Sequence, residues 1–194
     1  MPFFYNLRQE YLIINIMKRI TLLLSLIFIG MTALSAQTIT KGSFNLLVNP
    51  QNLDFKIDYQ SGIYKGLNFD ERMQLECEGA NPEAECKRTQ QSLRGYFISS
   101  FLERTTNYGY ALGTFDENKA KYRLTMHINS VSENGNTSAR YTITDLKTGE
   151  EIVEFTANSE GGVFGSFINL WGDGMQDAGS VVGKFFIKQI KKCR

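Results

Sequence analysis

Regular alternation of apolar and polar side chains in the second half of the chain constrains the fold more than any other feature. Three stretches, 121–131, 138–146 and 151–157, each place about every second residue on an apolar face. A period of two is typical of strands with one buried and one solvated face. Turn-forming residues separate the stretches at 133–136 and 145–149. The pattern therefore predicts a three-stranded antiparallel meander.

Two other segments have the periodicity of amphipathic helices. Apolar residues recur at intervals of three and four over 83–105 and again over 175–191. Asn81-Pro82 suits the start of the first helix, as a cap followed by a proline in the first turn. Short strands are expected at 43–48, 53–59 and 110–115, and 60–81 is expected to be irregular.

These elements predict the fold class. Helices with one apolar stripe and strands with one apolar face bury those surfaces against each other. We therefore expect an α+β fold, a two-layer sandwich of one mostly antiparallel sheet with two helices packed on one face. Residues 37–194 are expected to form a single globular α+β domain without internal repeats.

Residues 1–36 are expected to be a leader. The basic residues Lys18 and Arg19, after Met17, precede an apolar run at 20–31, and small residues follow before Gln37. This order is the three-part pattern of a secretory signal peptide. We place cleavage after Ala36, and an uncleaved anchor is the alternative.

The signal itself spans 17–36, so residues 1–16 lie upstream of a complete signal. Translation that starts at Met17 is favoured, with an unusually long leader as the alternative. Gln37, not a cysteine, follows the Leu-Ser-Ala triplet, and the first cysteine is Cys77. We therefore expect no lipid anchor, and a periplasmic or secreted protein.

The charge balance argues against nucleic acid as a partner. Without residues 1–36 the chain holds 18 basic and 19 acidic residues, a net charge of about −1 with neutral histidine. Nucleic-acid binding requires a basic surface. Strong attraction to anionic membranes requires one as well.

The cysteines point to a disulfide rather than a metal site. Cys77 and Cys86 bracket a short polar loop. In an oxidising compartment a bridge between them is expected, and two free thiols are the alternative. Cys193 is then free or intermolecular. The cysteine spacing is not that of a zinc site and His127 is the only histidine, so we expect no metal and no cofactor.

The segment 161–179 is the most unusual in composition, because six glycines stand among aromatic and aliphatic residues. It contains neither GxxxxGK[ST] nor GxGxxG between a strand and a helix, so a phosphate site is not indicated. Either a loop packs these apolar side chains under the last helix, or they are exposed and form a contact surface for a partner or a membrane. The candidate contact residues are Phe164, Phe167, Ile168, Leu170 and Trp171.

No catalytic residue can be assigned from the sequence. The chain contains neither GxSxG nor HExxH. His127 falls on the polar phase of its strand, where a lone histidine is more often a surface residue than a catalyst. A site built from carboxylates that are distant in sequence remains an alternative.

The order of elements and several turn residues resemble a known group of proteins. The stretch TDLKTGEEIVEF at 144–155, the GGVFGSF stretch and a closing amphipathic helix are similar to uncharacterised bacterial envelope families. These families are related to the TolB amino-terminal domain and the curli-secretion lipoprotein, whose fold is similar to the anticodon-binding domain. The resemblance covers about 50–192. It rests at residue level on Asp145, Thr148, Gly149, Gly161, Gly162 and Gly165.

The resemblance implies a non-enzymatic assembly or secretion component, and this chain departs from it in lacking the lipidation cysteine. We therefore expect an exported envelope protein that acts through protein–protein contacts, with another envelope protein or with itself. A hydrolase with a dispersed site and a binder of a small apolar ligand are the alternatives.

Overall fold

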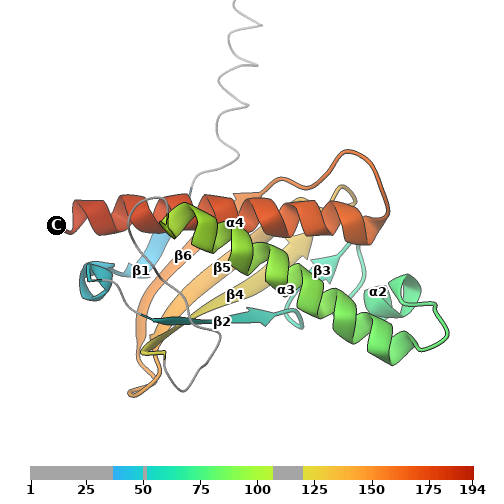
Figure 1. Ribbon diagram of the computed structural model, residues 1–194, viewed down its shortest axis with the longest axis horizontal. Helices are drawn as coiled ribbons and strands as arrows, with labels where there is room; N and C mark the ends of the chain where they lie inside the picture. The colour runs from blue at the N-terminus through green and yellow to red at the C-terminus, as the bar shows by residue number, and fades with distance from the viewer. Residues whose placement is uncertain (1–36, 50–51, 107–119) are drawn as a thin grey trace, which may run out of the picture. The chain divides into compact units, whose positions relative to one another are not determined.

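The computed structural model describes residues 37–49, 52–106 and 120–194 (Figure 1). The expected leader at 1–36 and the expected strand at 110–115 lie outside these ranges. The elements follow in this order: β1 (Thr38–Gly42), the 3-10 helix η1 (Asn45–Leu47), β2 (Leu53–Asp58), β3 (Ile63–Tyr64), α2 (Phe69–Glu76), α3 (Pro82–Thr106), β4 (Tyr122–Val131), β5 (Thr137–Asp145), β6 (Glu151–Ser159) and α4 (Phe167–Lys192).

The described strands form one mixed six-stranded sheet in the order β1-β6-β5-β4-β2, and β3 pairs with β4 beyond the end of β2. β4, β5 and β6 form the predicted antiparallel meander, and β1 adds to β6 in antiparallel pairing. β2 and β3 instead run parallel to β4. Parallel neighbours need a long crossover connection, and α2 and α3 lie between β2 and β4 in the chain.

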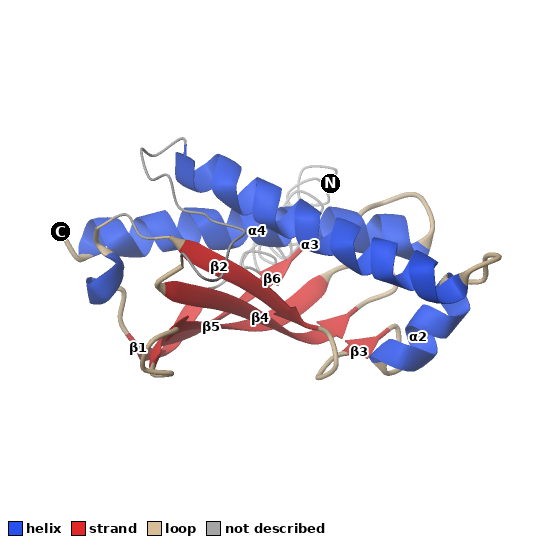
Figure 2. Ribbon diagram, turned by 60° about the horizontal axis from the view of Figure 1, so that its bottom comes forward, coloured by secondary structure: helices blue, strands red, loops and turns tan. Residues whose placement is uncertain are grey.

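The two long helices, α3 and α4, cover one face of the sheet (Figure 2). The predicted alternation of β4 is confirmed, because Tyr122, Leu124, Met126 and Ile128 are all buried. Large aromatic side chains from the helices meet this face; Phe97 of α3, for example, stacks on Tyr141 of β5. The α+β class predicted from the sequence is therefore confirmed. None of the described helices is long and apolar enough to cross a membrane.

The helices α3 and α4 approach each other closely because small residues line their contact. A β-carbon added to Gly179 of α4 would overlap the carbonyl oxygen of Phe97, and one added to Gly183 would lie 2.8 Å from the Arg104 β-carbon. Arg104 Nε also donates a hydrogen bond of 2.8 Å to Ser180 Oγ. Gly179 and Gly183 thus allow the close packing of α4 on α3.

The structure corrects the strand expected at 43–48. A strand lies earlier, at Thr38–Gly42, and Asn45–Leu47 forms a 3-10 helix. The buried residues Phe44 and Leu47 are three apart, which is the period of a 3-10 turn rather than of a strand.

The region 60–81, expected to be irregular, contains β3 and α2. Asn68 and Glu71 form a capping box at the start of α2, a local signal that the sequence prediction overlooked. The last helix begins at Phe167 rather than near Met175, after an amino-terminal cap by Ser166. The part of the glycine-rich segment 161–179 from Phe167 onward is therefore helical.

Candidate functional site

Two neighbouring apolar side chains on the β6–α4 loop stand out from the surface. Val163 is 82% exposed and Phe164 is 89% exposed. We call this pair the tip. Phe164 is the most exposed large apolar side chain in the part of the chain that the structure describes. Exposed apolar side chains that lie together mark interaction surfaces more often than single ones do.

The loop that carries the tip is fixed on both sides by hydrogen bonds. Before the tip, the backbone N–H of Glu160 donates to Asp177 Oδ2 at 2.9 Å and that of Gly161 donates to Asn136 Oδ1 at 2.8 Å. After the tip, the Ser166 side chain accepts a hydrogen bond from the Asn169 N–H and caps α4. The tip is therefore carried by a loop that is anchored on both sides.

A positive φ angle at Gly165 explains why α4 does not extend back to include the tip. Gly165 has φ of 129°, a region that residues with a β-carbon rarely occupy. The backbone thus turns sharply between Phe164 and Ser166. Phe164 consequently cannot continue the apolar stripe of α4.

The structure divides the predicted contact residues into exposed and buried ones. Phe164 is exposed and Ile168 is partly buried, whereas Phe167, Leu170 and Trp171 are buried. Of the two alternatives that the sequence left open, packing against the protein therefore holds for these three residues, because α4 begins at Phe167 and turns them inward.

Trp171 is completely buried among other rings. Its ring centroid lies 4.9 Å from that of Tyr64, 5.8 Å from Phe167 and 5.9 Å from Tyr59. Arg72 of α2 adds a guanidinium group 4.7 Å from the centroid of Phe167. This aromatic cluster joins α2, β3 and the start of α4 beneath the loop.

A groove of about 400 Å³ lies between α3 and α4 and is lined near the start of α4 by Ile168 and Asn169. Leu93, Tyr96 and Ile168 supply its apolar lining, and Ile168 stands only four residues after Phe164. Tyr96 is about half exposed. The polar lining of the groove includes the carboxylates of Glu85 and Asp173 and the guanidinium group of Arg88.

Sequence reasoning missed Val163, Tyr96 and Asp173 as parts of this surface. Val163 had a usable signal, because it adjoins the candidate Phe164 in the same glycine-rich stretch. Tyr96 and Asp173 are 77 residues apart in the chain, and only the packing of α3 on α4 brings them to one groove.

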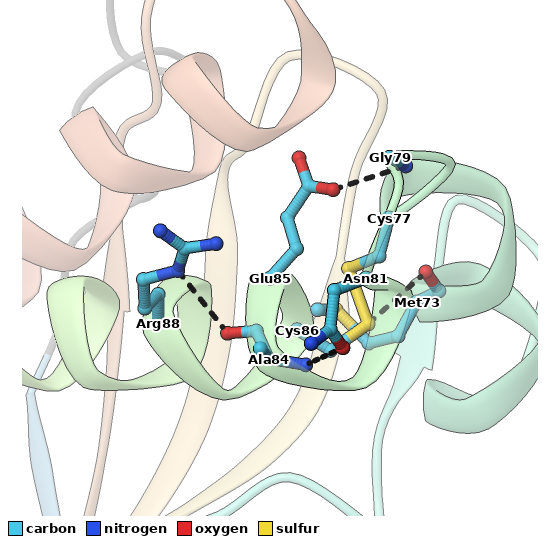
Figure 3. Close-up of a disulfide and its surroundings, with 8 residues drawn as sticks. All are labelled: Met73, Cys77, Gly79, Asn81, Ala84, Glu85, Cys86 and Arg88. Atoms are coloured by element: carbon cyan, nitrogen blue, oxygen red, sulfur yellow. Dashed lines mark hydrogen bonds between the residues drawn. A yellow bond between two sulfur atoms is a disulfide. The ribbon is translucent and has the colours of Figure 1, made fainter.

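A disulfide between Cys77 and Cys86 joins the end of α2 to the first turns of α3 (Figure 3). The predicted bridge is therefore present, with the two Cα atoms 5.6 Å apart. Within the loop, Glu85 accepts a hydrogen bond from the Gly79 N–H at 3.1 Å, and Glu85 also lines the groove. The bridge thus holds one wall of the groove. Cys193 is a free thiol.

The open face of the sheet carries His127 in a chain of polar contacts. β2 and β4 pair in register, so that Asp58 lies beside His127 and Asp54 beside Arg123. His127 Nδ1 is 3.1 Å from Asp58 Oδ2, and its Nε2 is 3.1 Å from Thr142 Oγ1. One imidazole thereby links three neighbouring strands.

These contacts also affect the ionisation of Asp58. Partial burial raises the pKa of Asp58, but hydrogen bonds from His127, the Gln60 backbone and Ser61 together lower the pKa below its ordinary value. Asp58 is therefore a carboxylate at neutral pH, suited to accept a hydrogen bond from the imidazole.

The order carboxylate, imidazole, hydroxyl has the connectivity of a nucleophilic triad, with Thr142 in the place of the serine. Thr142 is only 5% exposed, however. Its strand pairs on both sides, with β4 and β6, so the neighbouring backbone N–H groups are engaged in the sheet and cannot stabilise an oxyanion. The arrangement favours a structural role for His127.

Comparison with known proteins places the chain near no described family. No protein-family model matches it, and no curated protein matches it in sequence. Similar solved structures include the PelC dodecamer from Paraburkholderia phytofirmans, with 11% identity and a TM-score of 0.36 over 77% of this chain and 98% of that chain.

Another similar structure is a protein from Xanthomonas campestris, with 8% identity and a TM-score of 0.38 over 74% of this chain and 90% of that chain. A third is the LpoB carboxy-terminal domain from Salmonella enterica, with 13% identity and a TM-score of 0.24 over 60% of this chain and 94% of that domain. The resemblance to the TolB amino-terminal domain and the curli-secretion lipoprotein stays a prediction.

Proposed function

We propose that the protein is a non-enzymatic, exported envelope protein, an assembly or secretion accessory, that binds another protein molecule through the tip and the α3–α4 groove. The exposure of Val163 and Phe164 side by side on an anchored loop carries this proposal. Burying one such side chain completely gives roughly 1.5–3 kcal/mol, so two of them can contribute much of the free energy of a modest protein–protein contact.

Two independent features support export. The residues at 17–36 have the pattern of a signal peptide. The Cys77–Cys86 disulfide suits an oxidising compartment such as the periplasm or the exterior of the cell. The proposed location is therefore periplasmic or secreted.

The alternatives have less support. A hydrolase would need an accessible nucleophile beside His127, and Thr142 is buried. A binder of a small apolar ligand needs an enclosed apolar site. The groove between the helices is lined largely by polar side chains. So is a hollow on the open face of the sheet, which is lined by His127, Arg140 and Thr142 among others.

Site-specific photo-crosslinking in cells tests the contact. A photoreactive phenylalanine analogue replaces Phe164 in the full chain, and the same analogue at exposed Lys147, in the β5–β6 turn, serves as the matched control. We expect a crosslinked protein product at position 164 and none at 147. A second substitution, Val163→Ser, should weaken the product at 164. Illumination that leaves the position-164 protein entirely uncrosslinked in the envelope fraction would reject the proposal.

A further inference from the structure

The charges of α4 and its preceding loop are separated along the chain. Residues 160–177 contain three acidic and no basic residues, whereas residues 178–194 contain five basic and no acidic residues. Favourable interaction with the helix dipole accounts for charges in the first and last turns only. Lys184 and Lys188 lie farther from the end of α4 at Lys192, and both are exposed.

The acidic end of the protein includes the tip. The segment 68–85, which forms α2 and the start of α3, contains six acidic residues and one basic residue. The basic residue, Arg72, is paired with Glu76 at 3.1 Å and packs on Phe167 at the start of α4. The tip and the groove, with this acidic segment and Asp173, are called the head below.

The opposite end of α4 is basic and has an apolar residue nearby. We call it the tail; it comprises Lys184, Lys188, Lys191, Lys192, Arg194 and Leu46. The lysines and Arg194 are exposed, and Leu46 of η1 is 61% exposed. η1 is held at this end of α4 by Phe44, whose ring centroid lies 5.9 Å from that of Phe185 and 5.5 Å from that of Phe186.

Head and tail lie at opposite ends of α4, as Figure 1 shows from the position of the carboxyl terminus and of the β6–α4 loop. A 26-residue helix is about 39 Å long, so one molecule cannot bring its own head to its own tail. The two ends complement each other. The head has apolar side chains in surroundings that are mainly acidic, with Arg88 as a basic residue of the groove, and the tail has an apolar side chain beside basic ones.

We propose that the protein associates head to tail, with the tip and groove of one copy seated on the basic tail of α4 of a second copy. This inference rests on the proposed function, since it names the partner of the same surface. The two surfaces differ, so the contact is heterologous, and it builds rings or open chains rather than stopping at a dimer.

Charge decides between a second copy and a membrane as the occupant of the head. Asp173 and Asp177 lie beside the loop that carries the tip, and Glu160 precedes it. These acidic residues would be repelled by anionic lipid headgroups, which attract basic segments instead. The same acidic residues favour a protein surface rich in lysine, and the tail of this chain provides one. Attraction of this kind weakens as salt shortens the screening length.

The test uses protein made from the full chain and recovered from the envelope fraction, followed by sedimentation velocity at increasing concentration and two salt concentrations. The head variant is Phe164→Ser, with Phe164→Leu as its apolar control. The tail variant is the double substitution Lys184→Glu and Lys188→Glu. Its control, with the same net charge, is the double substitution Lys56→Glu and Lys147→Glu, at one position on the sheet and one in the β5–β6 turn.

We expect the average mass of the unchanged protein to rise with concentration and to fall at high salt. The head and tail variants should each weaken association at least about tenfold, and the two controls should associate nearly as the unchanged protein does. An equimolar mixture of the head and tail variants should form dimers that grow no further. The intact head of the tail variant binds the intact tail of the head variant, and both surfaces that remain free in this dimer are defective.

Protein that stays monomeric up to about 1 mM at low salt would overturn the inference. So would a mixture of the two variants that forms no dimer. Crosslinking at position 164 distinguishes failure of this inference from failure of the proposed function. A product of about twice the mass of the chain supports self-association. A product with a different protein supports the proposed function and contradicts the inference that the partner is a second copy.

Discussion

Gly95 and Gly179 both lie inside long helices, and replacing each with alanine should change stability in opposite directions. Gly95, in α3, is exposed, and nothing lies within 4 Å of a β-carbon added there. Alanine is about 0.8–1.0 kcal/mol more favourable than glycine inside a helix. Gly95→Ala should therefore stabilise the protein by up to about 1 kcal/mol.

Gly179→Ala gains the same helix propensity but meets the backbone of α3. The added β-carbon would overlap the Phe97 carbonyl oxygen and lie 3.0 Å from the Phe101 nitrogen. Backbone atoms cannot rotate away as side chains do, so α3 and α4 must separate. Overpacking costs about 1–3 kcal/mol and sometimes more, and a backbone overlap belongs at the upper end. We expect a net loss of about 2 kcal/mol.

Thermal and urea unfolding, followed by circular dichroism, compare the two variants with the unchanged protein. For a domain of this size, 1 kcal/mol corresponds to about 2–4 °C in Tm. Gly95→Ala should thus raise Tm by about 2–4 °C and Gly179→Ala should lower it by about 4–8 °C. A Gly179→Ala protein as stable as the Gly95→Ala protein would refute the close helix contact.

Two further predictions concern the disulfide and the open sheet face. Cys86→Ser removes the Cys77–Cys86 bridge and should lower the free energy of unfolding, measured in urea, by about 2.6 kcal/mol. This magnitude is the loss of chain entropy expected for a bridge between residues nine positions apart, and an unchanged urea midpoint would contradict it. The pKa of Asp58 is lower in the folded protein than in the unfolded chain. The contribution of Asp58 to stability is therefore complete above the unfolded pKa of about 3.9, and it is lost as the pH falls through the pKa of the folded protein. Asp58→Asn should therefore destabilise the protein at pH 7 and much less near pH 2, and an equal loss of stability at both pH values would count against the His127 contact.

Local sequence determines the elements whose periodicity is strong. The alternation in β4, β5 and β6 and the stripe of α3 follow from neighbouring residues, because side chains two or three to four apart share a face. The Cys77–Cys86 bridge was likewise predictable, since a short loop brings the two thiols together.

The glycine-rich segment shows what only the tertiary structure decided. Phe164 and Trp171 are seven residues apart and would share a face of one continuous helix. The positive φ of Gly165 and the Ser166 cap break that helix, so Phe164 is exposed while Trp171 is enclosed by rings from β3 and the β2–β3 connection.

The sequence by itself thus determined the elements with strong periodicity, the β4–β6 meander and α3, because that information lies in residues a few positions apart. The parallel pairing of β2 with β4, the meeting of Tyr96 with Asp173 and the position of α2 beside the start of α4 were decided by the tertiary structure. They depend on residues far apart in the chain, whose proximity arises only when the helices pack on the sheet.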